Sequence, residues 1–197
     1  MAGAARPNPG ISRPRLRGAL PCPRLPLDGA AAACYPGDVR YEPVLHVVLH
    51  QPEIPQNTGN VGRTCLAVGA KLWLVRPLGF RLDARNVRRA GLDYWDELDW
   101  EAVDDWETLS QRLPDARRWF LSKTASRLYT GADYRLGDVL VFGSETQGLP
   151  RSWLREHPEA SLRIPVRQPV RSLNLASSVA VVVFEALRQF RAAGVPW

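Results

Sequence analysis

Three short segments of the sequence combine glycine, proline and polar side chains in patterns that could bind a small ligand. The first, QPEIPQNTGNVGR, begins at Gln51; its glycines allow close approach to the backbone, and Asn57 or Thr58 can cap a following helix. Free N–H groups at a helix start bind anions such as phosphate. Arg63 would lie about one turn into that helix, near any bound group. A helix-capping loop that binds nothing explains the same residues.

The second segment, FGSETQGLP, begins at Phe142, directly after a run typical of a buried strand. Gly143 would let a flat ligand lie on the backbone, and Glu145 could contact a ligand or cap a helix start. Gly148 is followed by Leu-Pro rather than Lys-Ser/Thr, so this is not a Walker A loop, and no GxGxxG fingerprint occurs. A nucleotide-dependent oxidoreductase therefore has no motif to support it.

The third segment, IPVRQPVRSLNL, begins at Ile164 and contains two prolines that stiffen a strand-to-helix crossover. Arg167 and Arg171 lie beside this crossover. Ser172 and Asn174 are suitable N-cap residues for the last helix of the chain. Capping and ligand contact are compatible roles for this pair.

All three segments follow predicted strands. Runs of β-branched and apolar residues predict strands at residues 44–50, 71–76, 117–122, 138–142 and 161–165. Helical patterns cover residues 57–68, 83–90, 105–113 and 174–190, and the acidic stretch 93–107 predicts a solvated connection. This alternation predicts an α/β fold with a mainly parallel sheet and helices on both faces. Ligands of such sheets gather at the carboxyl ends of the strands.

The last helix is apolar around most of its circumference, so it must be covered on more than one side. Either a homodimer interface or a deep core position would provide the second cover. Two apolar sets follow helical spacing: Leu175, Val179, Val182, Ala186 and Phe190 form the first, and Ala176, Ala180, Val183 and Leu187 the second.

The composition places the chain among globular proteins. Its 197 residues suit one domain at 44–197, and it has no apolar run long enough to span a bilayer. The net charge of +6 favours an anionic partner only weakly. Three widely spaced cysteines form neither a metal motif nor a disulfide framework, which predicts no metal site and a reduced, cytoplasmic setting.

Residues 1–43 differ from the rest of the chain, because they contain eight prolines and five glycines and lack a hydrophobic period. We expect either a disordered extension or a segment upstream of the true translation start. Its early arginines also resemble a transit peptide in composition. A valine codon at Val44 could serve as an alternative start.

In their order and spacing, NTGNVGR, FGSETQGLP and IPVRQPVRSLNL resemble the three signature motifs of the SPOUT methyltransferases. PEIPQNTGN and the segment RRAGLDY (residues 88–94) are similar to the TrmL-type subfamily, which methylates the ribose 2′-hydroxyl of the wobble nucleotide of tRNA. The similarity covers residues 44–190.

The resemblance implies a trefoil knot in the carboxyl-terminal part of the domain, S-adenosylmethionine as methyl donor, and a homodimer formed through the last helix. The substrate would be cytidine or modified uridine at position 34, and no metal would be required. Phe184 stands where relatives often carry a tyrosine in this helix, so the ring is kept and any hydrogen bond from that hydroxyl to RNA or to a partner subunit would be missing.

Several site residues follow from the resemblance by position. Arg63 matches the catalytic arginine; because guanidinium groups keep their proton near neutral pH, it would hold a phosphate and orient the hydroxyl rather than act as a base. The expected donor-binding residues are Leu121, Gly143, Ile164, Ser172 and Leu173. The other expected pocket or substrate residues are Asn57, Asn60, Glu145 and Asn174.

Five arginines are candidates for RNA phosphate contacts, each of them weak individually. These candidates are Arg85, Arg88, Arg89, Arg167 and Arg171. Two alternatives remain open: a 2′-O-methyltransferase acting on another tRNA position or on rRNA, and a non-catalytic RNA-binding protein of the same fold. The intact motif residues disfavour the second alternative.

Overall fold

The computed structural model describes residues 42–81 and 94–195. All of these belong to one compact unit, Arg40–Trp197. The helix expected at 83–90 and nearly all of the segment 1–43 lie outside the described residues. Within the described residues, no helix is long and apolar enough to cross a membrane.

A seven-stranded sheet forms the centre of this unit, in the order β3-β2-β1-β6-β4-β7-β5. Every strand pairing in it is parallel. The strands are β1 (His46–His50), β2 (Lys71–Val75), β3 (Trp100–Val103), β4 (Arg118–Leu121), β5 (Arg127–Leu128), β6 (Val139–Phe142) and β7 (Ser161–Arg163). The predicted α/β class and parallel sheet are thereby confirmed.

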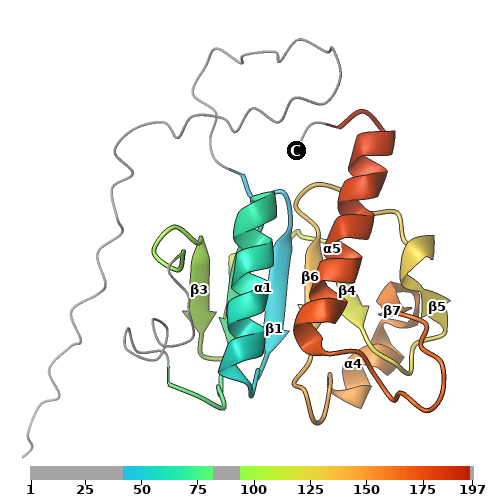
Figure 1. Cartoon of the computed structure of the whole chain (residues 1–197), viewed down its shortest axis with the longest axis horizontal. Helices are drawn as coiled ribbons and strands as arrows, with labels where there is room; N and C mark the ends of the chain where they lie inside the picture. The colour runs from blue at the N-terminus through green and yellow to red at the C-terminus, as the bar shows by residue number, and fades with distance from the viewer. Residues whose placement is uncertain (1–41, 82–93, 196–197) are drawn as a thin grey trace, which may run out of the picture. The chain divides into compact units, whose positions relative to one another are not determined.

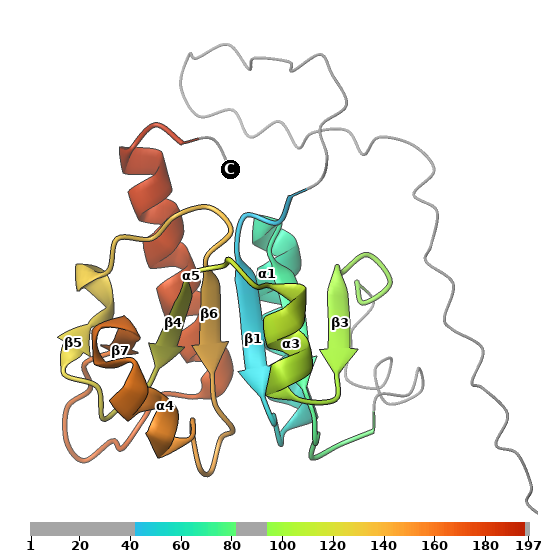
Figure 2. The same cartoon turned by 180° about the vertical axis from the view of Figure 1, so that it is seen from behind.

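Helices cover both faces of the sheet, as predicted. Helices α1 (Pro55–Val68) and α5 (Leu175–Ala192) lie on the face seen in Figure 1. The shorter helices α3 (Trp106–Arg112) and α4 (Arg151–Glu156) lie on the face seen in Figure 2. Alternation along β1 serves both layers, because Val47 and Leu49 pack in the core beneath α1 and α5, whereas Val48 packs in the opposite core.

The order of the strands places β6 between β1 and β4, and β7 beyond β4. Helix α5 follows β7 in the chain and returns to pack against α1. The trefoil knot concerns how the chain threads through itself rather than the order of its strands, and it stays a prediction.

The acidic stretch departs from its predicted role as a solvated connection. It contains the edge strand β3, and Trp95 and Leu98 are buried in the core. Its carboxylates have cationic partners on other elements: Lys71 lies 3.6 Å from Asp99 and 3.4 Å from Glu101. Edge strands often carry such charges. The short elements α4 and β5 were also not predicted.

The last helix is confirmed as α5, and most of its apolar side chains are covered by the chain's own core. Both apolar sets contribute to the core of the chain itself, with Val179, Val182, Val183 and Ala186 fully buried. Phe184, in contrast, has 55% of its surface exposed. The core position predicted for this helix therefore accounts for both apolar sets, and a homodimer interface stays a prediction for the side that carries Phe184.

Candidate functional site

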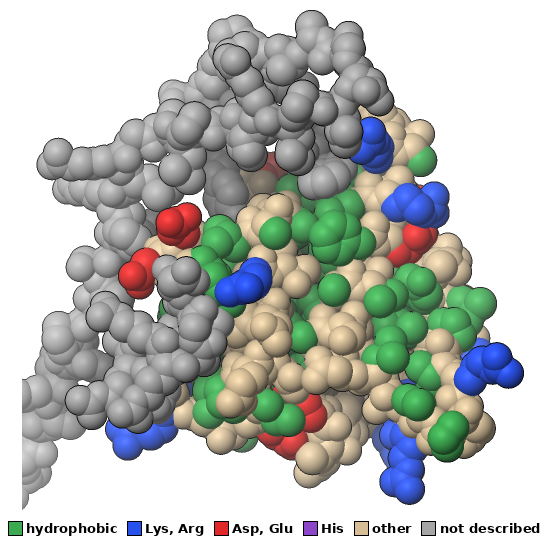
Figure 3. Space-filling view, viewed as in Figure 1, with side chains coloured by type: hydrophobic (Ala, Val, Ile, Leu, Met, Phe, Trp, Pro, Cys, Tyr) green, Lys and Arg blue, Asp and Glu red, His purple; other side chains and the backbone are tan. Residues whose placement is uncertain are grey.

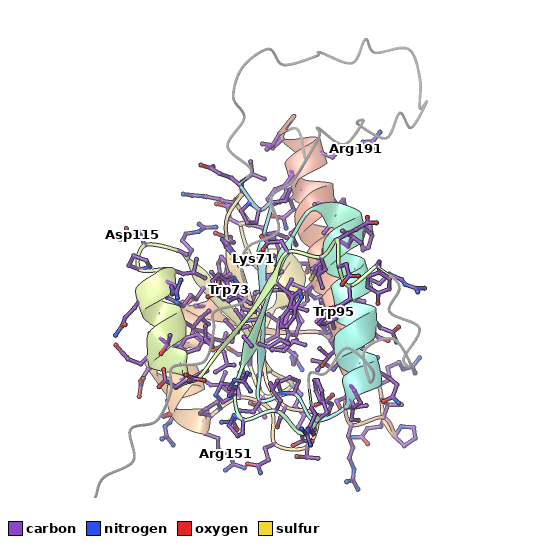
Figure 4. The ribbon with its side chains drawn as sticks, turned by 90° about the vertical axis from the view of Figure 1, so that its left-hand side faces the viewer. Lys71, Trp73, Trp95, Asp115, Arg151 and Arg191 are labelled. Atoms are coloured by element: carbon purple, nitrogen blue, oxygen red, sulfur yellow. The ribbon has the colours of Figure 1, made fainter. Side chains whose placement is uncertain are left out.

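The three predicted segments come together at the carboxyl ends of the strands, around a cavity of about 640 Å³. In Figures 1 and 2 this is the edge to which the strand arrows point, and both α1 and α5 begin there. Arg151, which also lines the cavity, lies at this end of the molecule in Figure 4, and Arg191 lies at the opposite end. The convergence expected from the sequence is confirmed.

Most of the predicted pocket residues line this cavity. They are Asn57, Leu121, Gly143, Glu145, Ile164, Ser172, Leu173 and Asn174. Leucine, isoleucine and phenylalanine side chains form one part of the wall, and hydroxyl and amide side chains form another. Such a mixture suits a ligand with a flat apolar ring and several polar groups.

A chain of hydrogen bonds joins the three segments through Glu145. Its carboxylate accepts from the backbone N–H of Glu53 at 2.8 Å and of Ile54 at 3.2 Å. It also accepts from the side-chain amide of Asn57 at 2.9 Å. The amide oxygen of Asn57 in turn accepts from the Asn174 side chain at 2.8 Å. Residues far apart in the sequence are thus held in one polar cluster.

Helix α1 begins at Pro55, two residues earlier than expected, and has no side-chain cap from its own N-cap residue, Ile54. Proline favours the first helical position, where its missing N–H is not needed. Asn57 and Thr58 are therefore buried inside the first turn, and their predicted capping role is wrong. The anion-binding site predicted at this helix start is occupied by the chain's own Glu145 carboxylate rather than by a phosphate.

Asn174 is the N-cap of α5, as predicted. Its side-chain oxygen accepts from the backbone N–H groups of Ala176 at 2.9 Å and Ser177 at 3.4 Å. Because the amide of Asn174 also reaches Asn57, one residue both caps α5 and connects it to the start of α1. Ser172 lines the cavity but does not cap the helix.

Gly143 is required by the turn itself. A Cβ atom at this position would lie 2.0 Å from the carbonyl carbon of Gly148 and 2.3 Å from the nitrogen of Leu149. The turn closes through a 2.9 Å bond from Gly148 N–H to the Ser144 carbonyl. Backbone of the same turn therefore occupies the space where a side chain would lie, while Gly143 itself lines the cavity and its contact with a ligand stays a prediction.

The glycines of the first segment also have a packing role. A Cβ atom on Gly62 would lie 2.9 Å from Leu98 and 3.0 Å from Trp95. The hydroxyl of Tyr94 donates to the Gly59 carbonyl at 2.7 Å. Figure 4 shows Trp95 beside α1. The close approach predicted for these glycines is made by residues 94–98 and not by a ligand.

Arg63 is exposed and does not line the cavity. It lies about two turns into α1 and about 9 Å along the helix axis from Asn57, on a different side of the helix. The expectation that it lies one turn in, at the junction of the three segments, is wrong, because six helical residues separate it from Asn57 and turn it to that different side. Asn60 is likewise exposed and outside the cavity; its carbonyl accepts from Thr64 at 3.2 Å.

The predicted phosphate-binding arginines are only partly described. Arg167 and Arg171 are exposed in the segment between β7 and α5 but do not line the cavity. Arg85, Arg88 and Arg89 lie outside the described residues.

Sequence reasoning missed the fourth wall of the cavity, residues 122–124 after β4, and also Arg151. Lys123 and Arg151 are the cationic side chains of the lining, and Glu145 is its carboxylate. The rule that selected the other segments would have found residues 122–124, because they also follow a predicted strand.

His50, at the end of β1, is a titratable group close to this edge of the sheet. Burial lowers its pKa, so it is neutral near pH 7. Its ring packs edge-on against Trp153, with 4.8 Å between ring centroids, and it does not line the cavity. The geometry therefore gives His50 a packing role.

We expect Glu145→Gln to lower the free energy of unfolding by about 1–3 kcal/mol, as the loss of charged hydrogen bonds does elsewhere. A glutamine amide nitrogen would face the N–H donors of Glu53 or Ile54, leaving one of them unpaired. Urea denaturation measures this change. Thr146→Val is the matched control, because it removes only an exposed 2.6 Å bond to Glu53. Equal stabilities of Glu145→Gln and wild type would contradict the role of Glu145.

Comparisons with known proteins agree with this geometry. Residues 44–184 match the model of the SpoU rRNA Methylase family. The tRNA (cytidine(34)-2′-O)-methyltransferase of Burkholderia cenocepacia is 48% identical over 150 residues, which is 74% of this chain and 96% of the relative.

Solved structures are similar as well. One, concerned with the 2-OH methylation of C/U34 on tRNA, is 47% identical with a TM-score of 0.71, covering 75% of this chain and 97% of that one. The AdoMet-bound rRNA methyltransferase from Sinorhizobium meliloti is 28% identical with a TM-score of 0.65, covering 76% and 61%.

Proposed function

This chain belongs to the SpoU methylase family, and from that premise we propose that it transfers a methyl group from S-adenosylmethionine to the ribose 2′-hydroxyl of nucleotide 34 of tRNA. The relatives at 48% and 47% identity are described by that substrate position. The observation that carries the proposal is the convergence of three distant segments on one cavity, held together by Glu145, Asn57 and Asn174.

The cavity suits the methyl donor in size and chemistry. Its volume of about 640 Å³ lies within the range of small-molecule sites. Leu121, Leu162 and Ile164 offer an apolar wall for the adenine ring, and Ser172 offers a polar contact. The donor supplies a methyl group bound to a positively charged sulfur. A related methyltransferase of known structure has AdoMet bound, which supports this assignment.

The contribution of the chain to the reaction is to align the two reacting groups. Bringing the ribose oxygen into line with the donor's methyl group can supply a large part of the rate enhancement. The cluster formed by Glu145, Asn57 and Asn174 fixes the cavity wall on which this alignment depends. The threading of the carboxyl-terminal segment into a trefoil knot would make that wall more rigid.

Arg63 holds a phosphate next to the reacting ribose and orients its 2′-hydroxyl, whose proton leaves to phosphate or water. Arginine presents a planar fork of N–H donors that matches a phosphate group. Because Arg63 lies on a different side of α1 from Asn57, it reaches a reacting hydroxyl most directly from a second copy of the chain. The proposed homodimer therefore brings Arg63 of one copy to the cavity of the other.

The homodimer forms through the exposed stripe of α5. Over the area of α1 and α5 in Figure 3, hydrophobic side chains lie among backbone and other uncharged atoms, with few charged side chains. Phe184, at 55% exposure, is the most exposed large apolar side chain among the described residues. Burying a phenylalanine contributes about 1.5–3 kcal/mol to association.

We expect Phe184→Glu to convert the dimer to monomers, because a carboxylate in an apolar interface is left without a partner. Sedimentation velocity measures the change. Leu128→Glu, at an apolar position on β5 that is 42% exposed, is the control and should leave the dimer intact. A dimer that persists unchanged in Phe184→Glu would place the interface elsewhere.

Transfer assays with purified protein test the substrate assignment. The substrates are a tRNA with cytidine at position 34 and the same tRNA with 2′-deoxycytidine there. We expect one methyl group per tRNA in the first and none in the second. Equal methylation of both would assign the activity to another position, and methylation of rRNA alone would favour the rRNA alternative. Absence of transfer together with absence of donor binding in calorimetry would favour a non-catalytic RNA-binding protein.

A further inference from the structure

We propose that Tyr94 is a positioning residue that holds the Arg63 side chain in the orientation needed for methyl transfer. The guanidinium carbon of Arg63 lies 4.9 Å from the centroid of the Tyr94 ring. Among the described residues, Arg63 forms no hydrogen bond or ion pair, so this ring is its principal contact. An exposed arginine without such a contact would sample many rotamers.

Tyr94 is itself held firmly against α1. Its hydroxyl donates to the Gly59 carbonyl at 2.7 Å, one turn before Arg63. The next residues along the chain reinforce this contact, because Trp95 and Leu98 pack where Gly62 has no side chain. The ring beneath Arg63 is therefore attached to the same helix that carries Arg63.

This arrangement explains the residue types of the motif GNVGR. The carbonyl of Gly59 accepts the tyrosine hydroxyl, and Gly62 lets Trp95 and Leu98 approach so closely that an added Cβ would force their side chains to shift. These glycines lie on a helix side turned toward residues 94–98 rather than toward the cavity. The positions of Gly59 and Gly62 relative to Arg63 therefore allow Tyr94 to pack beside Arg63.

The contact leaves Arg63 ready to bind an anion. An aromatic face attracts a guanidinium without using its N–H donors. The donors at the edge of the guanidinium plane therefore remain available for a phosphate group. A group oriented before binding loses less conformational freedom when the substrate arrives.

This inference rests on the proposed role of Arg63, and its test separates the two. Tyr94→Leu removes the aromatic face, whereas Tyr94→Phe keeps the face and removes the hydroxyl. We expect Tyr94→Leu to lower kcat about 10- to 100-fold, the range expected for a displaced catalytic group. The Kd for S-adenosylmethionine should stay within about twofold, because neither residue lines the cavity. Tyr94→Phe should keep most of the wild-type kcat.

A spectroscopic measurement reports the contact without any turnover. The Nε–H resonance of Arg63, identified as the one missing from Arg63→Lys, should be shifted by the ring current of Tyr94. This shift should persist in Tyr94→Phe and disappear in Tyr94→Leu. Tyr129→Leu is the matched control, because Tyr129 is half-buried outside the cavity, and it should change neither kcat nor the Arg63 resonance.

Each outcome has a definite meaning. Loss of the ring-current shift in Tyr94→Leu with an unchanged kcat would overturn the positioning role and leave the proposed function intact. An Arg63 resonance without a ring-current shift in the wild-type protein would overturn the contact itself. Absence of transfer by the wild-type protein would overturn the proposed function, whatever the spectrum shows. If Tyr94→Leu fails to fold, Tyr94→Met takes its place as the variant without an aromatic face: a lowered kcat with loss of the shift supports the role, and an unchanged kcat with loss of the shift contradicts it.

Discussion

Replacing Gly143 by alanine should abolish the binding of S-adenosylmethionine and lower the thermal midpoint of unfolding. The added Cβ would lie 2.0 Å from the carbonyl carbon of Gly148, so the turn after β6 must open. Because that turn also carries Glu145, its displacement disturbs the connection to Asn57 and the start of α1. Overpacking of this kind costs about 1–3 kcal/mol. For a chain of this size each kcal/mol corresponds to about 2–4 °C.

Gly137→Ala is the matched control for this variant. Gly137 has a φ of +79° and nothing within 4 Å of an added Cβ, so alanine there brings backbone strain without a clash. We expect it to lower the thermal midpoint modestly and to leave the Kd for S-adenosylmethionine unchanged. Calorimetric titration and a thermal scan measure both quantities. Native donor affinity in Gly143→Ala would show that the turn does not shape the cavity.

Replacing Arg63 by alanine should lower kcat by about 100- to 1,000-fold, the loss typical when one stabilising donor is removed from an active site. The donor affinity should stay within about twofold, because Arg63 does not line the cavity. Single-turnover transfer to tRNA and calorimetry measure the two effects separately.

Arg112→Ala provides the comparison for Arg63→Ala. Arg112 ends α3 on the opposite face of the sheet, where it lies 3.6 Å from Glu101. We expect near-normal turnover in that variant. Retained turnover in Arg63→Ala would remove this residue from any catalytic role, and a loss of donor affinity would mean that it acts on the cavity instead.

The general arrangement of the site could be predicted from the sequence because one rule of parallel sheets fixes it. Strands that alternate with helices all end at one edge, so segments beginning at Gln51, Phe142 and Ile164 had to meet there. The preference of asparagine for the N-cap likewise located Asn174 at the start of the last helix. Local residue patterns were sufficient for these features.

Other features depend on contacts between residues that are distant in the sequence. The cap of α1 comes from Glu145, which is 91 residues beyond Ile54, and no local pattern reveals it. Arg63 also lies away from the cavity, because six helical residues turn it to a different side of α1 from Asn57. Similarly, the acidic sequence of β3 suggested a loop, because its local pattern does not show that Lys71 and Arg112, on other elements, pair with Glu101.

Mapping of 2′-O-methylated nucleotides across the tRNA pool of a strain that lacks this protein tests the central claim most directly. We predict that methylation disappears at position 34 of specific tRNAs and remains at every other site. The wild-type chain should restore it, whereas Arg63→Ala should not. An unchanged level of 2′-O-methylation at position 34 in the deletion strain would contradict the proposed function.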